Sequence, residues 1–294
     1  MNHKLHKTLL AVSIATVLSA CGGGSGSTTP PVSDTTIDAT IAGTASKGII
    51  IGGLVIASEL GSTGIVLREV GRAITGADGT YSLNLNDQYE GGPIQVVVTK
   101  VGDGSTSMVC DAVGGCGTIG GTVVAFGDQF KPSSLSMKAL IADAVDGESI
   151  AVQITPFTHM AAERAVGAGG TLKTAINNAN SEVSQLLGGI DILSTPAVDI
   201  TDLVNANNPD PIAILYAAMN AAIAQLAVIT ANDGPDINAA LATLANSFSN
   251  CTIETTDNDD ESVALGEITE GAQNALTQAN VVDDSGTLAE LQNT

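Results

Sequence analysis

The sequence predicts an α+β protein in which a small N-terminal β-sandwich is followed by an all-α helical bundle. Between residues 37 and 130, short runs rich in β-branched residues alternate with turn-forming residues at intervals of roughly 8–12 residues. From residue 131 onward, apolar residues recur at three and four positions, which is typical of helices. We therefore divide the chain into a leader (1–20), a flexible segment (21–36), a sandwich domain (37–130) and a helical domain (131–294).

The first 20 residues have the pattern of a secretory leader. Lys4 and Lys7 precede the apolar run Thr8–Val17, which is too short to span a bilayer because that takes about 20 residues. Leu18–Cys21 reads Leu-Ser-Ala-Cys and resembles the bacterial lipobox. This resemblance implies that the mature chain starts at Cys21 and that its thiol carries diacylglycerol. The alternative is an ordinary secretory leader followed by an incidental cysteine.

A flexible segment is predicted after Cys21, since Gly22–Thr29 contains only Gly, Ser and Thr before Pro30–Pro31 stiffens its end. Such a segment lets a folded body stand away from a membrane to which two or more acyl chains anchor it. Position 22 is Gly rather than Asp, and by resemblance to the sorting rule of enteric lipoproteins this favours the outer membrane. Attachment to the inner membrane, facing the periplasm, is the alternative. Either placement locates the protein in the cell envelope.

The predicted strands of the sandwich are short and rich in Val, Ile and Leu. They are Ile37–Ala42, Ile49–Ile51, Leu54–Ile56, Ile65–Leu67 and Ile94–Val98. The clearest strand follows Asp78-Gly79, a pair that supplies the positive-φ residue of a tight turn. Beyond it, apolar and polar residues alternate, so Tyr81, Leu83 and Leu85 are predicted to face the core.

Two segments of this region carry a family resemblance. Gly43–Gly48 is an early Gly-bearing strand, and Thr75–Ser82 reads T-G-A-D-G-T-Y-S. Together they resemble the carboxypeptidase-regulatory-like (transthyretin-like) sandwich, in which such a strand is followed by a T-x-A-D-G-x-Y turn. The resemblance implies a domain that serves as a spacer or an adhesion module without catalysis. The Gly-rich excursion at Cys110–Cys116 departs from the family pattern and leaves the last strands undefined.

The helical half is predicted from apolar stripes closed by Gly, Pro, Asn and Asp. The predicted helices are Leu135–Val145, Thr158–Val166, Leu172–Leu187, Ile212–Ala231, Ile237–Phe248 and Leu265–Ala279. Ile212–Ala231 is apolar on all sides and is long enough to cross a bilayer. We favour a buried central helix, because Ala partitions weakly into membranes, basic flanks are absent and Asp210 abuts the start. This half, with Ile154–Thr158 as a Thr-Pro turn, resembles Ala-rich bundles of uncharacterised proteobacterial lipoproteins.

The four cysteines predict one short disulfide. Cys21 is assigned to the lipid, and Cys110 and Cys116 flank a Gly-containing loop in a chain expected in an oxidising compartment. We expect a Cys110–Cys116 bridge, which leaves Cys251 as a buried thiol or as the partner of another cysteine. Bridges from Cys251 to either of the other two remain open. The spacing does not resemble a zinc site, and His159 is the only histidine beyond the leader.

Charge and composition exclude several classes of function. The net charge of −21 opposes binding to nucleic acid and to anionic headgroups, and removal of the leader makes it more negative. The absence of Trp and the low aromatic content of 2% disfavour glycosidases and lectins. No phosphate-binding glycine loop is present, so we predict no cofactor and no nucleic-acid partner. The acidic run Asp257–Glu261 lacks the spacing of a calcium loop and is interpreted as a solvated cap for the next helix.

His159 is the one residue that permits a catalytic hypothesis. It lies near the predicted start of a helix, and a spatial arrangement with a Ser, Thr or Cys nucleophile would make it a general base. No G-x-S-x-G elbow accompanies it. We favour the interpretation of His159 as a polar residue at a helix start, so we predict no catalytic residues.

We expect a non-enzymatic, lipid-anchored cell-envelope protein that acts by binding, through adhesion or through contact with another envelope protein. The first alternative is a periplasm-facing accessory of an outer-membrane uptake system. In that hypothesis the helical bundle shelters an apolar ligand such as a fatty acid or hydrocarbon. The second alternative is a hydrolase that uses His159.

Overall fold

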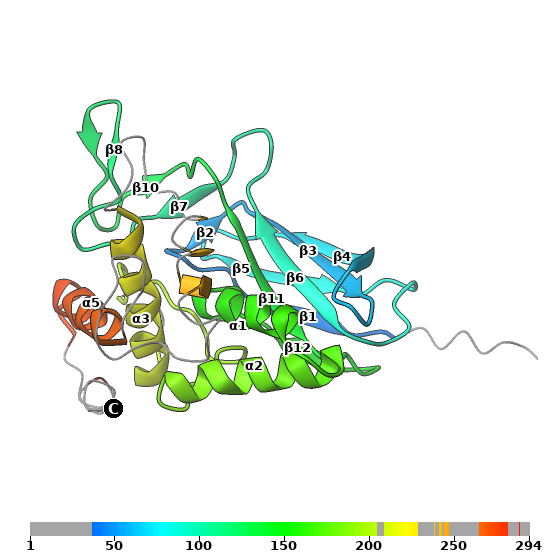
Figure 1. Ribbon diagram of the computed structural model, residues 1–294. Coiled ribbons are helices and arrows are strands. Elements are labelled where there is room, and N and C mark those ends of the chain that lie inside the picture. The colour runs from blue at the N-terminus through cyan, green and yellow to red at the C-terminus, as the bar shows by residue number, and fades with distance from the viewer. Residues whose placement is uncertain are drawn as a thin grey trace, which may run out of the picture. The chain divides into compact units, whose positions relative to one another are not determined.

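The α+β fold class is confirmed, with several small β-sheets preceding the helices (Figure 1). The computed structural model describes residues 37–204, 209–228, 238, 241–242, 244–246, 265–281 and 288. The predicted leader, Cys21, Cys251 and the acidic run Asp257–Glu261 lie outside the described residues.

The largest sheet is antiparallel and has the strand order β11-β6-β3-β4. Its strands are β3 (Leu54–Leu60), β4 (Val66–Ile74), β6 (Ile94–Thr99) and β11 (Ser136–Ile141). Along β6, the side chains of Ile94, Val96 and Val98 are fully buried and alternate with half-buried neighbours. This period of two is what a central strand with one face on the core requires.

A second sheet has the order β12-β1-β5, with β1 (Thr40–Thr44) between β5 (Thr80–Asn84) and β12 (Ser149–Ala151). β1 pairs antiparallel with β5 but parallel with β12. The predicted Asp78-Gly79 turn is confirmed, because Gly79 has a φ of 75° and the side chains of Tyr81 and Leu83 are buried. A Cβ at position 79 would also come within 3.0 Å of the Ala45 carbonyl oxygen.

Two smaller pieces complete the β region. β2 (Ile50–Ile51), β7 (Ser107–Val109) and β10 (Gln129–Phe130) form a three-stranded sheet, and β8 (Thr118–Ile119) pairs with β9 (Thr122–Val123). One apolar cluster joins side chains from the β12-β1-β5 sheet to those of the largest sheet, as expected for two packed layers. It includes Ile41, Leu83, Val55, Val98 and Met137.

The helix predicted over Leu135–Val145 is wrong, since residues 136–141 form strand β11. β11 pairs with β6 from Ser136↔Thr99 to Ile141↔Ile94. Met, Ala and Leu are good helix formers, but this intrinsic preference is weak and tertiary pairing overrides it. Without β11, the outer edge of β6 would have unpaired backbone groups. The β-structure therefore continues to Ala151 at the end of β12, beyond the change of period predicted near Pro132.

The remaining helix predictions that fall on described residues are confirmed. The helices are α1 (Pro156–Gly167), α2 (Leu172–Leu186), α3 (Pro211–Val228) and α5 (Leu265–Gln278). Thr155 caps α1 in a reciprocal capping box with Thr158, and Thr171 caps α2. Residues 238, 241–242 and 244–246 are helical within the predicted segment 237–248.

The helices form two packed pairs. α1 lies with α2 and against β11, whereas α3 packs along α5 (Figure 1). Within α3, side chains from Leu215 to Ile223 are buried in the helical core, which supports the buried-helix interpretation of this apolar segment. In the part of the chain that the structure describes, no helix combines the length and apolar character that a bilayer crossing requires.

Candidate functional site

Cys110 and Cys116 form a disulfide, as the sequence analysis expects. Their Cα atoms lie 5.7 Å apart, and both side chains are buried in the loop that follows β7. The bridge closes a loop that contains Asp111 and turns at Gly115, whose φ of 86° suits a residue without a side chain. The loop therefore holds Asp111 next to the sandwich core.

Lys47 and Asp111 form an ion pair that is almost excluded from solvent. Lys47 Nζ lies 3.1 Å from Asp111 Oδ1 and 3.4 Å from Oδ2. The two side chains are only 1% and 6% exposed. The backbone N–H of Gly48 donates a further hydrogen bond of 2.6 Å to Oδ2. The segment between β1 and β2 thus supplies two donors to one carboxyl group.

Burial shifts both groups of this pair toward their neutral forms. Loss of hydration lowers the pKa of the Lys47 amine, and the attraction and hydrogen bond of Asp111 offset only part of that effect. The same loss raises the pKa of the Asp111 carboxyl, against the opposing effects of Lys47 and the Gly48 N–H. The neutral amine and carboxylic acid therefore lie closer in free energy to the ion pair than they do in water.

Neither Lys47 nor Asp111 was predicted from the sequence as a site residue. The available signal was a single lysine at the start of the apolar run Ile49–Ile51, where a solvated charge is out of place. Asp111 directly follows a cysteine of the predicted disulfide, which was a second signal. Their pairing across 64 residues was not visible in the sequence.

His159 lies in the first half of α1, where it faces β11. Its Nδ1 accepts a hydrogen bond of 3.3 Å from the backbone N–H of Lys138, and its Nε2 lies 3.7 Å from Glu163 Oε1. The same Glu163 oxygen lies 2.9 Å from Lys138 Nζ. Burial lowers the pKa of His159 to about 4, with Glu163 opposing the shift and Lys138 adding to it. The imidazole is therefore neutral at pH 7.

In this geometry the lone pair of His159 Nδ1 is used by a hydrogen bond from the backbone. In a neutral imidazole only one ring nitrogen accepts a hydrogen bond, and here that nitrogen is Nδ1. Nε2 then carries the proton and faces Glu163. Among the described residues, no Ser, Thr or Cys side chain hydrogen-bonds to His159. The contacts of His159 fit a helix residue that fastens α1 to β11.

A pocket of about 650 Å³ opens beside this cluster. Residues of α1, the first residue of β11 and the segment 238–246 line it together. They are Ser136, His159, Glu163, Arg164, Gly167, Asn238, Leu241, Ala242, Ala245 and Asn246. The Asn238 side chain accepts a hydrogen bond of 3.0 Å from the backbone N–H of Ser136, which fastens one wall to β11. The lining of the pocket is therefore partly apolar and partly polar.

Comparison with protein-family models, with curated proteins and with solved structures found no match to this chain. The two family resemblances seen in the sequence therefore remain predictions.

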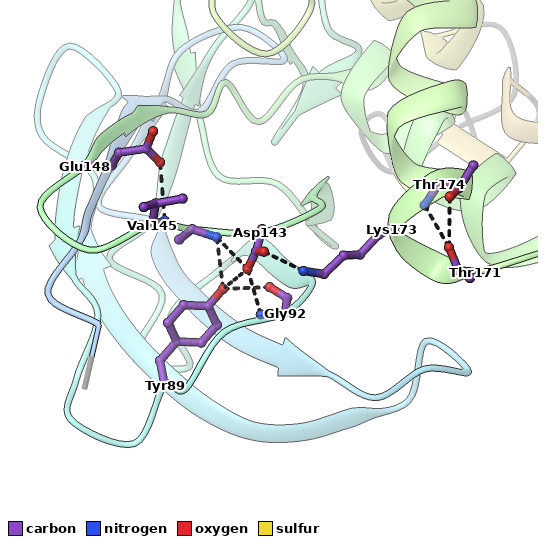
Figure 2. Close-up of polar contacts among 9 residues, drawn as sticks. Tyr89, Gly92, Asp143, Val145, Glu148, Thr171, Lys173 and Thr174 are labelled. Carbon is purple, nitrogen blue, oxygen red and sulfur yellow. Dashed lines mark hydrogen bonds and ion pairs between the residues drawn. The ribbon is translucent and has the colours of Figure 1, made fainter. Parts of the chain in front are cut away.

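A third polar cluster lies apart from His159 and centres on Asp143 (Figure 2). Its carboxylate accepts hydrogen bonds from the Gly92 N–H at 2.8 Å and from the Tyr89 hydroxyl at 3.1 Å, and it pairs with Lys173 of α2. The N–H of Ala144 in turn donates to the Tyr89 oxygen at 3.0 Å. These contacts join α2 to the β region, so we interpret the cluster as structural.

Metal binding finds no support in the described ranges. No group of three or more His, Cys, Asp or Glu side chains is placed there to hold a metal ion. Asp143 and Lys173 satisfy each other, and Glu163 is shared between Lys138 and His159. The carboxylates of both clusters already have basic partners within the fold.

Proposed function

We propose that this protein is a lipid-anchored protein of the bacterial cell envelope and that it acts by binding a protein partner. The lipobox-like Leu18–Cys21 and the Gly- and Ser-rich segment after it support the anchor and the tether. The Cys110–Cys116 disulfide is consistent with an oxidising compartment outside the cytoplasm. A partner in the envelope follows from this placement.

The observation that carries the binding role is an exposed apolar patch where β4 begins. Ile65, Val66 and Leu67 are 67%, 49% and 59% exposed, although all three are large and apolar. β4 is the end strand of its sheet. The side chain of Val166, from α1, is also exposed and lies next to Gly64, the residue that precedes Ile65. Apolar residues gathered on a strand edge are typical of surfaces that pair with another protein. We call Ile65–Leu67 and Val166 the β4 edge patch.

The experiment is site-specific photocrosslinking in intact cells. A photoreactive residue at position 65 is compared with one at position 123, since Val123 is a similarly exposed apolar residue (61%) on the β8–β9 hairpin. We expect a discrete crosslinked product from position 65 and none from position 123. Equal products from both positions, or none from either, would contradict a role for the β4 edge patch.

The anchor is tested separately with Cys21→Ser. We expect the wild-type chain to label with a radioactive fatty acid and to sediment with membranes, and the variant to lose both properties. A wild-type chain that is not labelled would remove the anchor from the proposal. The crosslink would remain interpretable, because it does not depend on the lipid.

The pocket beside His159 supports a second candidate, the sheltering of a small apolar or amphipathic molecule. Leu241, Ala242 and Ala245 supply apolar lining, and His159 and Glu163 supply polar lining. Ala245→Phe narrows the pocket without adding charge. If the candidate is correct, a fluorescent fatty acid binds to the wild-type protein and at least tenfold more weakly to the variant. Equal binding to both would place the fatty acid elsewhere.

A further inference from the structure

Lys47 and Asp111 are arranged as a nucleophile and its carbonyl target. The Lys47 nitrogen lies 3.1 Å and 3.4 Å from the two carboxyl oxygens, so it approaches the carboxyl carbon that they share. The Gly48 N–H binds Oδ2 at 2.6 Å and is placed to stabilise negative charge on that oxygen. Oδ1, the oxygen nearer to Nζ, is left as the leaving group.

The backbone on both sides of the pair is held tightly. A Cβ at Gly48, where φ is +54°, would lie 1.8 Å from the carbonyl oxygen of Val109. The two chain segments therefore touch directly beside the reacting groups. The disulfide loop fixes Asp111 from the other side, through Cys110. The fold therefore holds the two reacting groups in contact. Holding reactants together in this way is the main reason why intramolecular reactions are fast.

We propose that Lys47 and Asp111 condense into an intramolecular amide bond that crosslinks the segment after β1 to the segment after β7. The amine nitrogen attacks the carboxyl carbon of Asp111, and the developing charge on Oδ2 is held by the Gly48 N–H. A proton passes from Nζ to the Oδ1 hydroxyl, which leaves as water. One C–N bond forms, one C–O bond breaks and one water molecule is released, so no oxidant or activating group is required.

Burial supplies the protonation states that this step needs. The depressed pKa of Lys47 favours the amine with a free lone pair, and the raised pKa of Asp111 favours a hydroxyl that leaves as water. Because both side chains are almost fully shielded, bulk water has little access to reverse the reaction.

The test is a tryptic peptide map of the full chain, purified from membranes in detergent, reduced and alkylated. An unlinked chain releases Gly48–Arg68 and Val101–Lys138, since Pro132 protects the bond after Lys131. A linked chain releases neither, because trypsin does not cleave after an acylated lysine. We expect both peptides to be absent. In their place we expect one branched species, in which the uncleaved peptide that contains Lys47 and ends at Arg68 is joined to Val101–Lys138. Its mass is lower by one water than the sum of these two peptides, and its fragment ions join Lys47 to Asp111.

Lys47→Arg is the matched control, because it keeps the positive charge and the trypsin site but has no amine to acylate. We expect both peptides to appear from this variant, whether or not it folds. If the wild-type chain released both free peptides in the same yield as the Lys47→Arg variant, the proposal would be overturned and the pair would be an ordinary buried ion pair. Water lost from Val101–Lys138 alone, without a join to Lys47, would overturn it equally.

Discussion

The side-chain oxygens of Thr155 and Tyr216 lie 2.7 Å apart and connect the N-cap of α1 to the middle of α3. Both side chains are fully buried. The Tyr216 hydroxyl also donates to the carbonyl of Ile192 at 3.2 Å, while Thr155 Oγ1 accepts from the N–H of Thr158. One hydroxyl pair thus holds together two helices and the turn that follows α2.

Replacement of Tyr216 by Phe removes this connection but keeps the ring that packs near Phe157. We expect Tyr216→Phe to lower the free energy of unfolding by about 1–3 kcal/mol, because a buried carbonyl and a buried threonine lose a partner. Thr277→Ala is the control, since its hydrogen bond lies on the exposed face of α5 and its loss is expected to cost less than about 0.5 kcal/mol. Chemical denaturation measures both, and equal losses would contradict the buried network.

The Asp143 cluster predicts unequal effects of its two charged members. Asp143 accepts hydrogen bonds from Gly92, Tyr89 and Lys173, whereas among the described residues the Lys173 side chain makes a polar contact only with Asp143. Lys173 is also half exposed, so Lys173→Met is expected to cost less than about 1 kcal/mol. We expect Asp143→Ala to cost more than Lys173→Met in urea denaturation. A larger effect at Lys173 would show that the ion pair, rather than the hydrogen bonds, holds α2 to the β region.

The contribution of Asp143 to stability is expected to depend on pH and to be lost in acid. Burial alone would raise the pKa of Asp143, but hydrogen bonds from Lys173, Gly92 and Tyr89 outweigh it and the pKa is lowered. A carboxyl group with a lowered folded-state pKa stabilises the protein above its unfolded pKa and loses that contribution as pH falls through the folded value. We therefore expect the gap in stability between wild type and Asp143→Asn to shrink on acidification below the ordinary Asp range.

His159 predicts a loss of stability in a higher pH range. Its pKa falls from 6.5 in the unfolded chain to about 4 in the fold, so only the unfolded chain binds a proton between these values. Stability consequently decreases as pH falls from 6.5 to about 4, by up to about 3 kcal/mol from this one group. His159→Asn removes the titration, and we expect its stability relative to wild type to rise by this amount over the range. If the difference in stability between His159→Asn and wild type stayed constant over this range, the pKa of His159 would be the same in the folded and unfolded chain.

The disulfide is expected to stabilise the sandwich moderately. A loop with a sequence separation of 6 between its cysteines limits the unfolded chain only locally, which corresponds to about 2 kcal/mol. We expect the double variant Cys110→Ala/Cys116→Ala to unfold at lower denaturant by that amount. Wild type in a reducing agent should behave in the same way. A much larger loss would indicate that release of Asp111 also disrupts its contact with Lys47.

The sequence predicted those elements whose pattern is local. The Asp78-Gly79 turn, the alternation from Tyr81 to Leu83 and the helix closed by Gly188 all follow from neighbouring residues, and all are present. Strand β11 was missed because its residues prefer helix in isolation and its pairing partner β6 lies about 40 residues away in the chain.

The candidate sites divide in the same way. The Cys110–Cys116 bridge was visible because only six positions separate the cysteines. The Lys47–Asp111 pair, the His159 contacts with Lys138 and the Asp143 cluster all join distant segments, and no local pattern shows which residues pair. At His159 the sequence favoured a polar residue near the start of a helix, and His159 lies in α1 with contacts to Lys138 and Glu163.

The parallel pairing of β1 with β12 has a consequence for how the chain acquires its structure. Thr40 pairs with Ser149 in this register. During synthesis, the edge of β1 that faces β12 therefore stays unpaired until more than 100 further residues have been made. Contacts of such long range slow the search for the native topology, and an uncovered strand edge invites association with other chains in the meantime. Newly made molecules are thus most vulnerable to aggregation before Ala151 is in place, and a truncation that ends before β12 is expected to accumulate as insoluble material.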